Sequence, residues 1–173
     1  MIKSKSVVLV GFMGTGKSSV GKILAKHMRR QLVDVDQYIE KKEKRKISDI
    51  FEKEGEAEFR RLEKEAIREI SEIDGAVITT GGGAVLDPEN LEALKKTGCL
   101  VALFASPETI FDRVKNSRHR PLLKAKDVYG EIKRLLEIRK PYYEKADVCC
   151  QTDGRTPSEV AKVILEKLET EVF

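Results

Sequence analysis

The chain has 173 residues, of which 40% are hydrophobic and 36% are charged. This length suits one domain with a single core, and the composition excludes a disordered chain. The 33 basic and 29 acidic residues give a net charge of +4 and are spread along the whole sequence. Because nucleic-acid-binding proteins concentrate their positive charge on one face or tail, we expect no nucleic-acid partner. The small basic excess fits anionic substrates and fits an ordinary solvated surface equally well.

The sequence predicts a cytoplasmic protein without a membrane partner, and we expect a monomer. The apolar run Val7–Val10 is too short for a signal peptide, and no stretch approaches the roughly 18 apolar residues of a membrane span. The cysteines Cys99, Cys149 and Cys150 are odd in number and contain no CxxC motif. This pattern argues against a disulfide framework or a zinc site, and we interpret all three as inert thiols in apolar surroundings.

Short apolar runs alternate with segments of helical period, which is typical of an α/β protein with a parallel sheet. The runs are rich in Val, Ile and Leu, as strands buried on both faces should be. Helices are expected from Lys17 and near Pro88, Pro107 and Pro157, because proline is tolerated in the first helical turn. The expected strands are Val7–Val10, Leu32–Val35, Ala76–Thr79, Leu100–Phe104 and Val148–Gln151.

Two stretches interrupt this alternation. Residues 37–73 are charged and helical in pattern, break at Gly55 and contain no strand, so they predict a helical insert that projects over the sheet. Residues 115–127 are dense in basic side chains and predict a mobile lid. We therefore expect a single domain over residues 1–173, with an insert at approximately 37–73 and a lid at approximately 115–127.

The segment from Gly11 to Ser18 matches the phosphate-loop motif G-x-x-x-x-G-K-[ST] in full, between an expected strand and an expected helix. Glycines let the backbone N–H groups turn toward a phosphate, and the helix N-terminus adds partial positive charge. Lys17 would supply an ammonium group to the β- and γ-phosphates, and the Ser18 hydroxyl would ligate Mg²⁺. The expected nucleotide-binding residues here are Gly14, Thr15, Gly16, Lys17, Ser18 and Ser19.

Two acidic residues, Asp34 and Asp36, come at the end of the second expected strand. Because alternate residues of a strand point the same way, both carboxylates should face the ligand crevice at the strand ends. Our hypothesis is that Asp34 helps to hold Mg²⁺, directly or through water, while Asp36 accepts a hydrogen bond from a substrate hydroxyl. The alternative is that Asp36 only caps a helix that begins near Gln37.

Several motifs, in the same order along the chain, resemble those of the shikimate kinase family. The resemblance runs from residue 7 to about residue 150 and implies a three-layer P-loop kinase fold with a five-stranded parallel sheet, similar to nucleoside monophosphate kinases. It also implies ATP with Mg²⁺ and transfer to the 3-hydroxyl of shikimate, a step of chorismate and aromatic amino acid biosynthesis. The motifs are the phosphate loop through Gly21, Ser48–Phe51, Gly55-Glu56, Phe59–Glu63, Thr80–Val85, Arg120–Leu123 and Arg139–Tyr143.

By position, the resemblance implies that Asp36, Arg60, Gly82 and Arg139 contact shikimate. Guanidinium groups bind carboxylates in a bidentate manner, so the two arginines suit the acid group of this substrate. Arg60 also has glutamates at salt-bridge spacing, so a surface ion pair is the alternative in the absence of the motif. The glycine triplet Gly81, Gly82 and Gly83 would let a ligand approach the backbone, although a tight turn without ligand is also open.

The resemblance further implies that Arg120 reaches from the lid toward the phosphates and that Arg113 lies against adenine. Arg113 falls on an expected helix, where an ordinary exposed role is equally expected. Arg155, in the segment Gly154–Pro157, is expected to line the base. Asp36, Lys17 and Arg120 would be the catalytic residues, because phosphoryl transfer needs an oriented hydroxyl and stabilised phosphate charge.

Two other functions remain open at this point. A kinase for another small acceptor, such as gluconate or a nucleoside monophosphate, would share the phosphate loop. A P-loop GTPase switch would also share it, but such switches usually carry an Asn-Lys-x-Asp motif, and this tetrapeptide does not occur in the sequence.

Overall fold

The computed structural model describes residues 5–115 and 127–170. Within them, a five-stranded, wholly parallel sheet has the strand order β2-β3-β1-β4-β5. The predicted fold class and all five predicted strands are confirmed, with no strand end more than two residues from its predicted position. The strands are β1 (Ser6–Gly11), β2 (Leu32–Asp34), β3 (Val77–Thr79), β4 (Gly98–Phe104) and β5 (Val148–Gln151).

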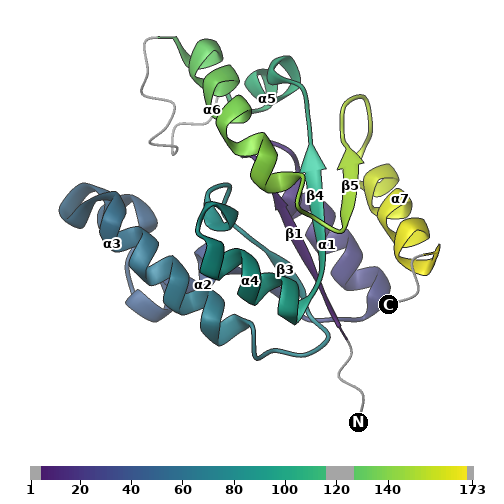
Figure 1. Ribbon diagram of the computed structural model, residues 1–173, viewed down its shortest axis with the longest axis horizontal. Coiled ribbons are helices and arrows are strands. Elements are labelled where there is room, and N and C mark those ends of the chain that lie inside the picture. Colours follow the sequence, from purple (N-terminus) through teal and green to yellow (C-terminus); the bar gives the residue numbers. More distant parts are fainter. Residues whose placement is uncertain (1–4, 116–126, 171–173) are drawn as a thin grey trace.

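Helices cover both faces of the sheet and make three layers (Figure 1). Alternate residues of β1 point to opposite faces: Val7 and Leu9 pack with α1 and α7, whereas Val8 and Val10 pack with the helices of the other layer. The helices are α1 (Lys17–Met28), α2 (Val35–Glu43), α3 (Ile47–Ile70), α4 (Pro88–Thr97), α5 (Pro107–Val114), α6 (Val128–Tyr143) and α7 (Pro157–Thr170), with a short 3-10 helix η1 (Ala84–Leu86).

Local capping chemistry sets the starts of several helices. Asp87 accepts hydrogen bonds from the first amides of α4, and the Ser106 hydroxyl accepts one from the Thr109 amide of α5. In both helices the first residue is a proline, which needs no hydrogen-bond acceptor at that position. The predicted helix starts at Lys17, Pro88, Pro107 and Pro157 are therefore confirmed.

The charged stretch at 37–73 folds as α2 and α3 and contains no strand. The predicted break is a kink at Gly55, whose φ of 83° and ψ of −179° interrupt α3. The two helices lie side by side at the end of the molecule next to the β2 edge of the sheet (Figure 1). The substrate-binding role of this segment stays a prediction. The predicted lid, with Arg120, lies almost entirely in residues 116–126, outside the described residues.

The interpretation of the cysteines is wrong for one of the three. Cys99 and Cys150 are buried, but Cys149 is exposed. The reason is that β5 is an edge strand whose residues alternate between buried and exposed positions, so neighbouring cysteines point to opposite sides. Among the helices of the described residues, none is long and apolar enough to cross a membrane.

Candidate active site

The phosphate loop connects the central strand β1 to α1. Gly14 and Gly16 have φ values of 76° and 98°, a left-handed conformation that glycine adopts readily. Gly16 is the residue that precedes α1, and no side chain caps the first amides of this helix. Lys17 Nζ donates hydrogen bonds to the carbonyl oxygens of Gly11 and Phe12, at 2.8 and 2.9 Å. The loop thus presents a helix N-terminus and an ammonium group at one point, which suits an anion.

Three hydroxyl residues of this motif differ in exposure. Thr15 is buried, and its hydroxyl donates to the Phe12 carbonyl oxygen at 2.8 Å, so its side chain stabilises the loop. Ser18 and Ser19 lie in the first turn of α1 and are exposed. The Ser18 hydroxyl is therefore accessible to a metal ion that arrives with a nucleotide.

The local structure differs from the prediction both at Asp34, the last residue of β2, and at Asp36. The strand ends at Asp34 and Val35 already begins α2, so the expected strand alternation between Asp34 and Asp36 is wrong. The alternative prediction, that Asp36 caps the helix, is also wrong, because Asp34 does so. Its carboxylate accepts a 2.9 Å hydrogen bond from the Gln37 amide and a 2.7 Å hydrogen bond from the Thr79 hydroxyl. Asp36 instead lies in the first turn of α2.

Asp36 occupies an environment that disfavours its charged form. Burial, together with the negative charges of Asp34 and Glu63, raises its pKa to about 6, although the positive charges of Lys17 and Arg60 act in the opposite direction. Its Oδ1 atom is buried and has no hydrogen-bond partner among the described residues. A buried carboxylate oxygen without a donor is unfavourable, so this atom is suited to accept a hydrogen bond from a ligand hydroxyl.

Arg60 is held by two glutamates on its own helix. Its Nη1 atom lies 2.7 Å from Oε2 of Glu63, and its Nη2 atom lies 3.2 Å from Oε1 of Glu56. The ion pairs that the spacing indicated therefore form, but Glu63 is fully buried and not part of a surface pair. Burial raises the pKa of Glu63, against the opposing charges of Arg60 and Arg139. Sequence reasoning noted the spacing of Glu63 but missed its place in the site.

The glycine triplet after β3 lies where these side chains meet. A Cβ atom added at Gly81 would lie 3.2 Å from Oε1 of Glu63 and 3.3 Å from Oδ1 of Asp36. One added at Gly82 would lie 3.4 Å from the Met13 amide nitrogen of the phosphate loop and 3.5 Å from Nη1 of Arg139. One added at Gly83 would overlap the Arg60 guanidinium, with Nη1 at 2.7 Å. The triplet therefore brings Asp36, Arg60, Arg139 and the phosphate loop together.

Arg139 comes to this point from α6 and is only 7% exposed. Its guanidinium carbon lies 5.5 Å from the centroid of the Phe12 ring, so the cation packs against the phosphate loop. One turn later, the hydroxyl of Tyr143 donates a 2.6 Å hydrogen bond to the Gly82 carbonyl oxygen. Sequence reasoning included Tyr143 in the motif Arg139–Tyr143 but assigned it no role, although it lies four residues after Arg139 on the same helix.

Arg113 connects the phosphate loop to the segment after β5. Its Nη1 atom donates to the Gly14 carbonyl oxygen at 3.0 Å and to the Thr152 hydroxyl at 3.1 Å. Arg155 is exposed on the same segment and donates to the Gln151 carbonyl oxygen at 2.9 Å. Arg113 therefore reaches the phosphate loop itself, whereas Arg155 bonds within the segment after β5, and the contact of either arginine with adenine stays a prediction.

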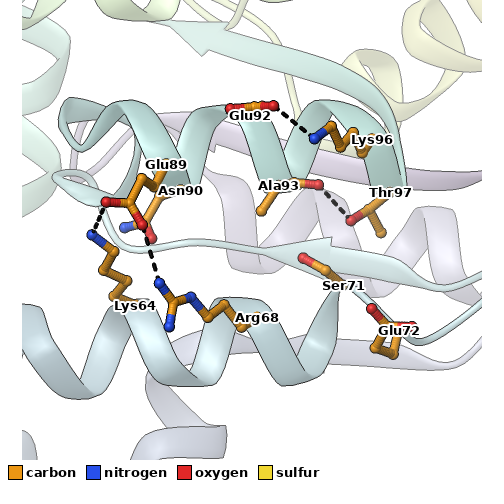
Figure 2. Close-up of a pocket in the computed structure, with 10 residues that line it drawn as sticks. All are labelled: Lys64, Arg68, Ser71, Glu72, Glu89, Asn90, Glu92, Ala93, Lys96 and Thr97. Carbon is orange, nitrogen blue, oxygen red and sulfur yellow. Dashed lines mark hydrogen bonds and ion pairs between the residues drawn. The ribbon is translucent and has the colours of Figure 1, made fainter.

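A groove of about 490 Å³ between α3 and α4 contains none of the predicted site residues (Figure 2). Five of its charged side chains are paired with one another: Glu89 contacts Lys64 at 2.7 Å and Arg68 at 3.1 Å, and Lys96 contacts Glu92 at 2.6 Å. We therefore place the candidate site at the phosphate loop. The groove is lined by Lys64, Arg68, Ser71, Glu72, Glu89, Asn90, Glu92, Ala93, Lys96 and Thr97.

A parallel sheet whose central strand leads into a phosphate loop, beside a buried carboxylate and two arginines, defines a P-loop kinase. The chain belongs to the shikimate kinase family, because the family model described as shikimate kinase matches residues 13–169.

Relatives of known sequence and structure agree with this assignment. A shikimate kinase from Thermodesulfovibrio yellowstonii is 50% identical over 165 residues, which are 95% of each chain. One from Thermus thermophilus is 47% identical over 94% of this chain and 89% of its own. The solved structure of shikimate kinase from Acinetobacter baumannii in complex with shikimate has a TM-score of 0.93 at 35% identity, covering 98% of this chain and 96% of that one. The structure from Aquifex aeolicus has a TM-score of 0.81 at 38% identity, with coverages of 95% and 96%.

Proposed function

We propose that this protein transfers the γ-phosphoryl group of ATP to the 3-hydroxyl of shikimate, giving shikimate 3-phosphate for aromatic amino acid biosynthesis. The observation that carries the proposal is the convergence of Asp36, Arg60 and Arg139 on the glycine triplet beside the phosphate loop. Family membership supports the same reaction.

The binding of the acceptor follows from the charges around the triplet. Arg60 is a partly buried cation and Arg139 a buried one, and a carboxylate is the natural partner of a guanidinium there. Asp36 offers an oxygen without a hydrogen-bond donor to a substrate hydroxyl. The backbone N–H groups of Gly81, Gly82 and Gly83 complete a surface that suits an acid carrying several hydroxyl groups.

Phosphoryl transfer then depends on orientation and charge. With a pKa of about 6, Asp36 is ionised at neutral pH and is basic enough to orient the attacking hydroxyl or take its proton. Lys17, whose positive charge also acts on Asp36, would stabilise the charge on the β- and γ-phosphates. Arg120, outside the described residues, is proposed to add a second cation from the lid. Arg113 and Arg155 are proposed to line the adenine.

The residues at the phosphate loop fit Mg²⁺. This ion keeps several waters and uses one or two protein oxygens plus substrate phosphates. The Ser18 hydroxyl is exposed at the start of α1, and each carboxylate oxygen of Asp34 accepts one hydrogen bond and retains a free lone pair. We propose that Ser18 ligates the ion and Asp34 holds it through water. When bound, Mg²⁺ neutralises charge that develops between the β- and γ-phosphates.

The direct test is to incubate the purified protein with ATP, Mg²⁺ and shikimate and to look for shikimate 3-phosphate by mass spectrometry. Gluconate and a nucleoside monophosphate serve as alternative acceptors, and GTP as the alternative donor, in a coupled assay of ADP release. We expect turnover with shikimate and ATP. Faster turnover with another acceptor, or equal use of GTP with no acceptor dependence, would overturn the proposal.

Replacing Gly83 with alanine should weaken the binding of shikimate without weakening the binding of ATP. The backbone at Gly83 has φ −96° and ψ −4°, which alanine adopts without strain, so the protein should still fold. The new Cβ would overlap the Arg60 guanidinium and displace it from the acid group of the substrate. We expect the KM for shikimate to rise by roughly tenfold, as for the loss of a charged hydrogen bond. Steady-state kinetics with each substrate varied in turn provides the measurement, and a parallel rise in the KM for ATP would contradict the explanation.

A further inference from the structure

Tyr143 is a buried tyrosine that lies next to the site without belonging to the groups expected to contact substrate. It is 1% exposed, and its ring meets the Phe104 ring edge-on at a centroid distance of 6.3 Å. Its hydroxyl donates to the Gly82 carbonyl oxygen at 2.6 Å. Burial raises its pKa to about 12, so the hydroxyl keeps its proton and remains a donor at neutral pH.

Arg139 lies close to the same glycine, because a Cβ atom added at Gly82 would lie 3.5 Å from its Nη1 atom. The Arg139 guanidinium lowers the pKa of Tyr143 through its charge and a hydrogen bond, against the larger effect of burial. Because a hydroxyl donates one hydrogen bond and accepts others, Tyr143 can accept from Arg139 while it donates to Gly82. Such a chain of hydrogen bonds in a buried site is mutually reinforcing.

The hydrogen bond from Tyr143 to Gly82 matters because three glycines in succession have little conformational preference of their own. The ends of the triplet are fixed by backbone hydrogen bonds from Thr80 to Leu9 and from Ala84 to Gly81. The peptide between Gly82 and Gly83 is trans, so the Gly82 C=O and the Gly83 N–H point in opposite directions. The Gly83 N–H makes no hydrogen bond to another described residue. Because Tyr143 holds the Gly82 carbonyl, this N–H points away from Tyr143.

We propose that the Tyr143 hydroxyl is a positioning group that fixes both the Gly82–Gly83 peptide and the Arg139 guanidinium in the arrangement that receives shikimate. The inference rests on the proposed function, since it assigns Tyr143 to the binding of that acceptor. Tyr143 acts through Gly82 and Arg139. Its hydroxyl therefore determines affinity for the acceptor and leaves the nucleotide side of the site unchanged.

The test compares two tyrosine variants on the same turn of α6. Tyr143→Phe keeps the ring and removes the hydroxyl, and it should fold because one neutral hydrogen bond is a small part of domain stability. We expect its KM for shikimate to rise by roughly tenfold, with the KM for ATP within about twofold of wild type. Tyr142→Phe is the matched control, because the Tyr142 hydroxyl makes no hydrogen bond to another described residue and its ring packs at the edge of the core. This variant should match wild type for both substrates.

A third variant separates positioning from plain packing. Phe104→Leu removes the ring that meets Tyr143 but keeps the hydroxyl. It should lower the thermal midpoint more than Tyr143→Phe does and change the KM for shikimate less. If the KM for shikimate instead follows the thermal midpoint across these variants, or if Tyr143→Phe binds shikimate like wild type, the inference fails. Absence of shikimate phosphorylation by the wild-type protein would be a different result, since it would reject the proposed function itself.

Discussion

Replacing Asp36 with asparagine should reduce kcat by roughly 10²- to 10⁴-fold, the usual contribution of a positioned general base. An amide of the same shape cannot take a proton and offers only one acceptor oxygen to the attacking hydroxyl. The phosphate loop does not depend on Asp36 for its hydrogen bonds, because Lys17 donates to the carbonyl oxygens of Gly11 and Phe12. The KM for ATP should therefore change little. Steady-state kinetics of both substrates measures the two effects separately.

The pH dependence of the wild-type enzyme should report the same group. The pKa of Asp36 is raised from 3.8 to about 6, so the carboxylate is protonated in a growing fraction of molecules as the pH falls below about 6. We expect kcat/KM for shikimate to fall on that acid side, approaching tenfold per pH unit. The residual activity of the asparagine variant should lack this dependence. A pH–rate profile with the same acid limb in both proteins would assign the titration to another group.

The asparagine variant should also be more stable than the wild type at pH 7. The folded-state pKa of Asp36 lies above its unfolded value, so the folded state binds the proton more tightly and stability falls as the pH rises from about 4 to about 6. Above that window the ionised carboxylate destabilises the fold by on the order of 3 kcal/mol, which the neutral amide avoids. Denaturant unfolding at pH 7 should give a higher free energy of unfolding for the asparagine variant than for the wild type. At pH 4 the two proteins should have nearly the same free energy of unfolding.

An exposed aspartate provides the control for both measurements. Asp112 lies on α5 and pairs with Lys115 at 2.8 Å on the surface, where such ion pairs contribute little. Asp112→Asn should leave kcat and the free energy of unfolding close to wild type. Equal stabilisation of both variants would mean that net charge, and not the buried position of Asp36, is responsible.

The parts of the fold that sequence predicted well are those that depend on neighbours along the chain. The phosphate loop needs its glycines, its lysine and the flanking strand and helix, and all of these lie within residues 6–28. Proline and a capping side chain mark the starts of α4 and α5 in the same local way. Such signals are readable because the hydrogen bonds that they describe join residues only two to six positions apart.

The wrong predictions concern residues whose local hydrogen bonds can favour either a strand or a helix, and residues whose position depends on packing between distant parts of the chain. Asp34 was expected to continue a strand, but its side chain caps α2 and ends β2, which turns Asp36 into a helical residue. Cys149 was interpreted as buried, and only the position of β5 at the sheet edge shows otherwise. Glu63 and Tyr143 belong to the site through contacts with Gly81 and Gly82, and Gly82 is 61 residues from Tyr143. No pattern along the sequence encodes a contact at that separation.

Replacing Lys17 with methionine should reduce both nucleotide affinity and turnover, in contrast to the change at Asp36. Methionine keeps the length of the side chain but removes the ammonium group and with it the two hydrogen bonds to the loop carbonyls. The loop loses part of its fixed shape, and the β- and γ-phosphates lose a cation that stabilises charge in the transition state. We expect kcat to fall by roughly 10²- to 10³-fold and the KM for ATP to rise, with shikimate binding by calorimetry nearly unchanged.

Lys22→Met is the matched control, because Lys22 is exposed on the same helix. Its removal changes the net charge equally, so a similar loss of activity in both variants would show that general electrostatic attraction of ATP is responsible. The decisive contrast is between the two ends of the site. Lys17 contacts the phosphate loop, whereas Asp36 faces the glycine triplet. Lys17→Met should therefore weaken ATP binding, and Asp36→Asn should leave ATP binding unchanged. If both substitutions weaken the same substrate, the phosphate loop and the acceptor side are not the separate binding surfaces that this geometry describes.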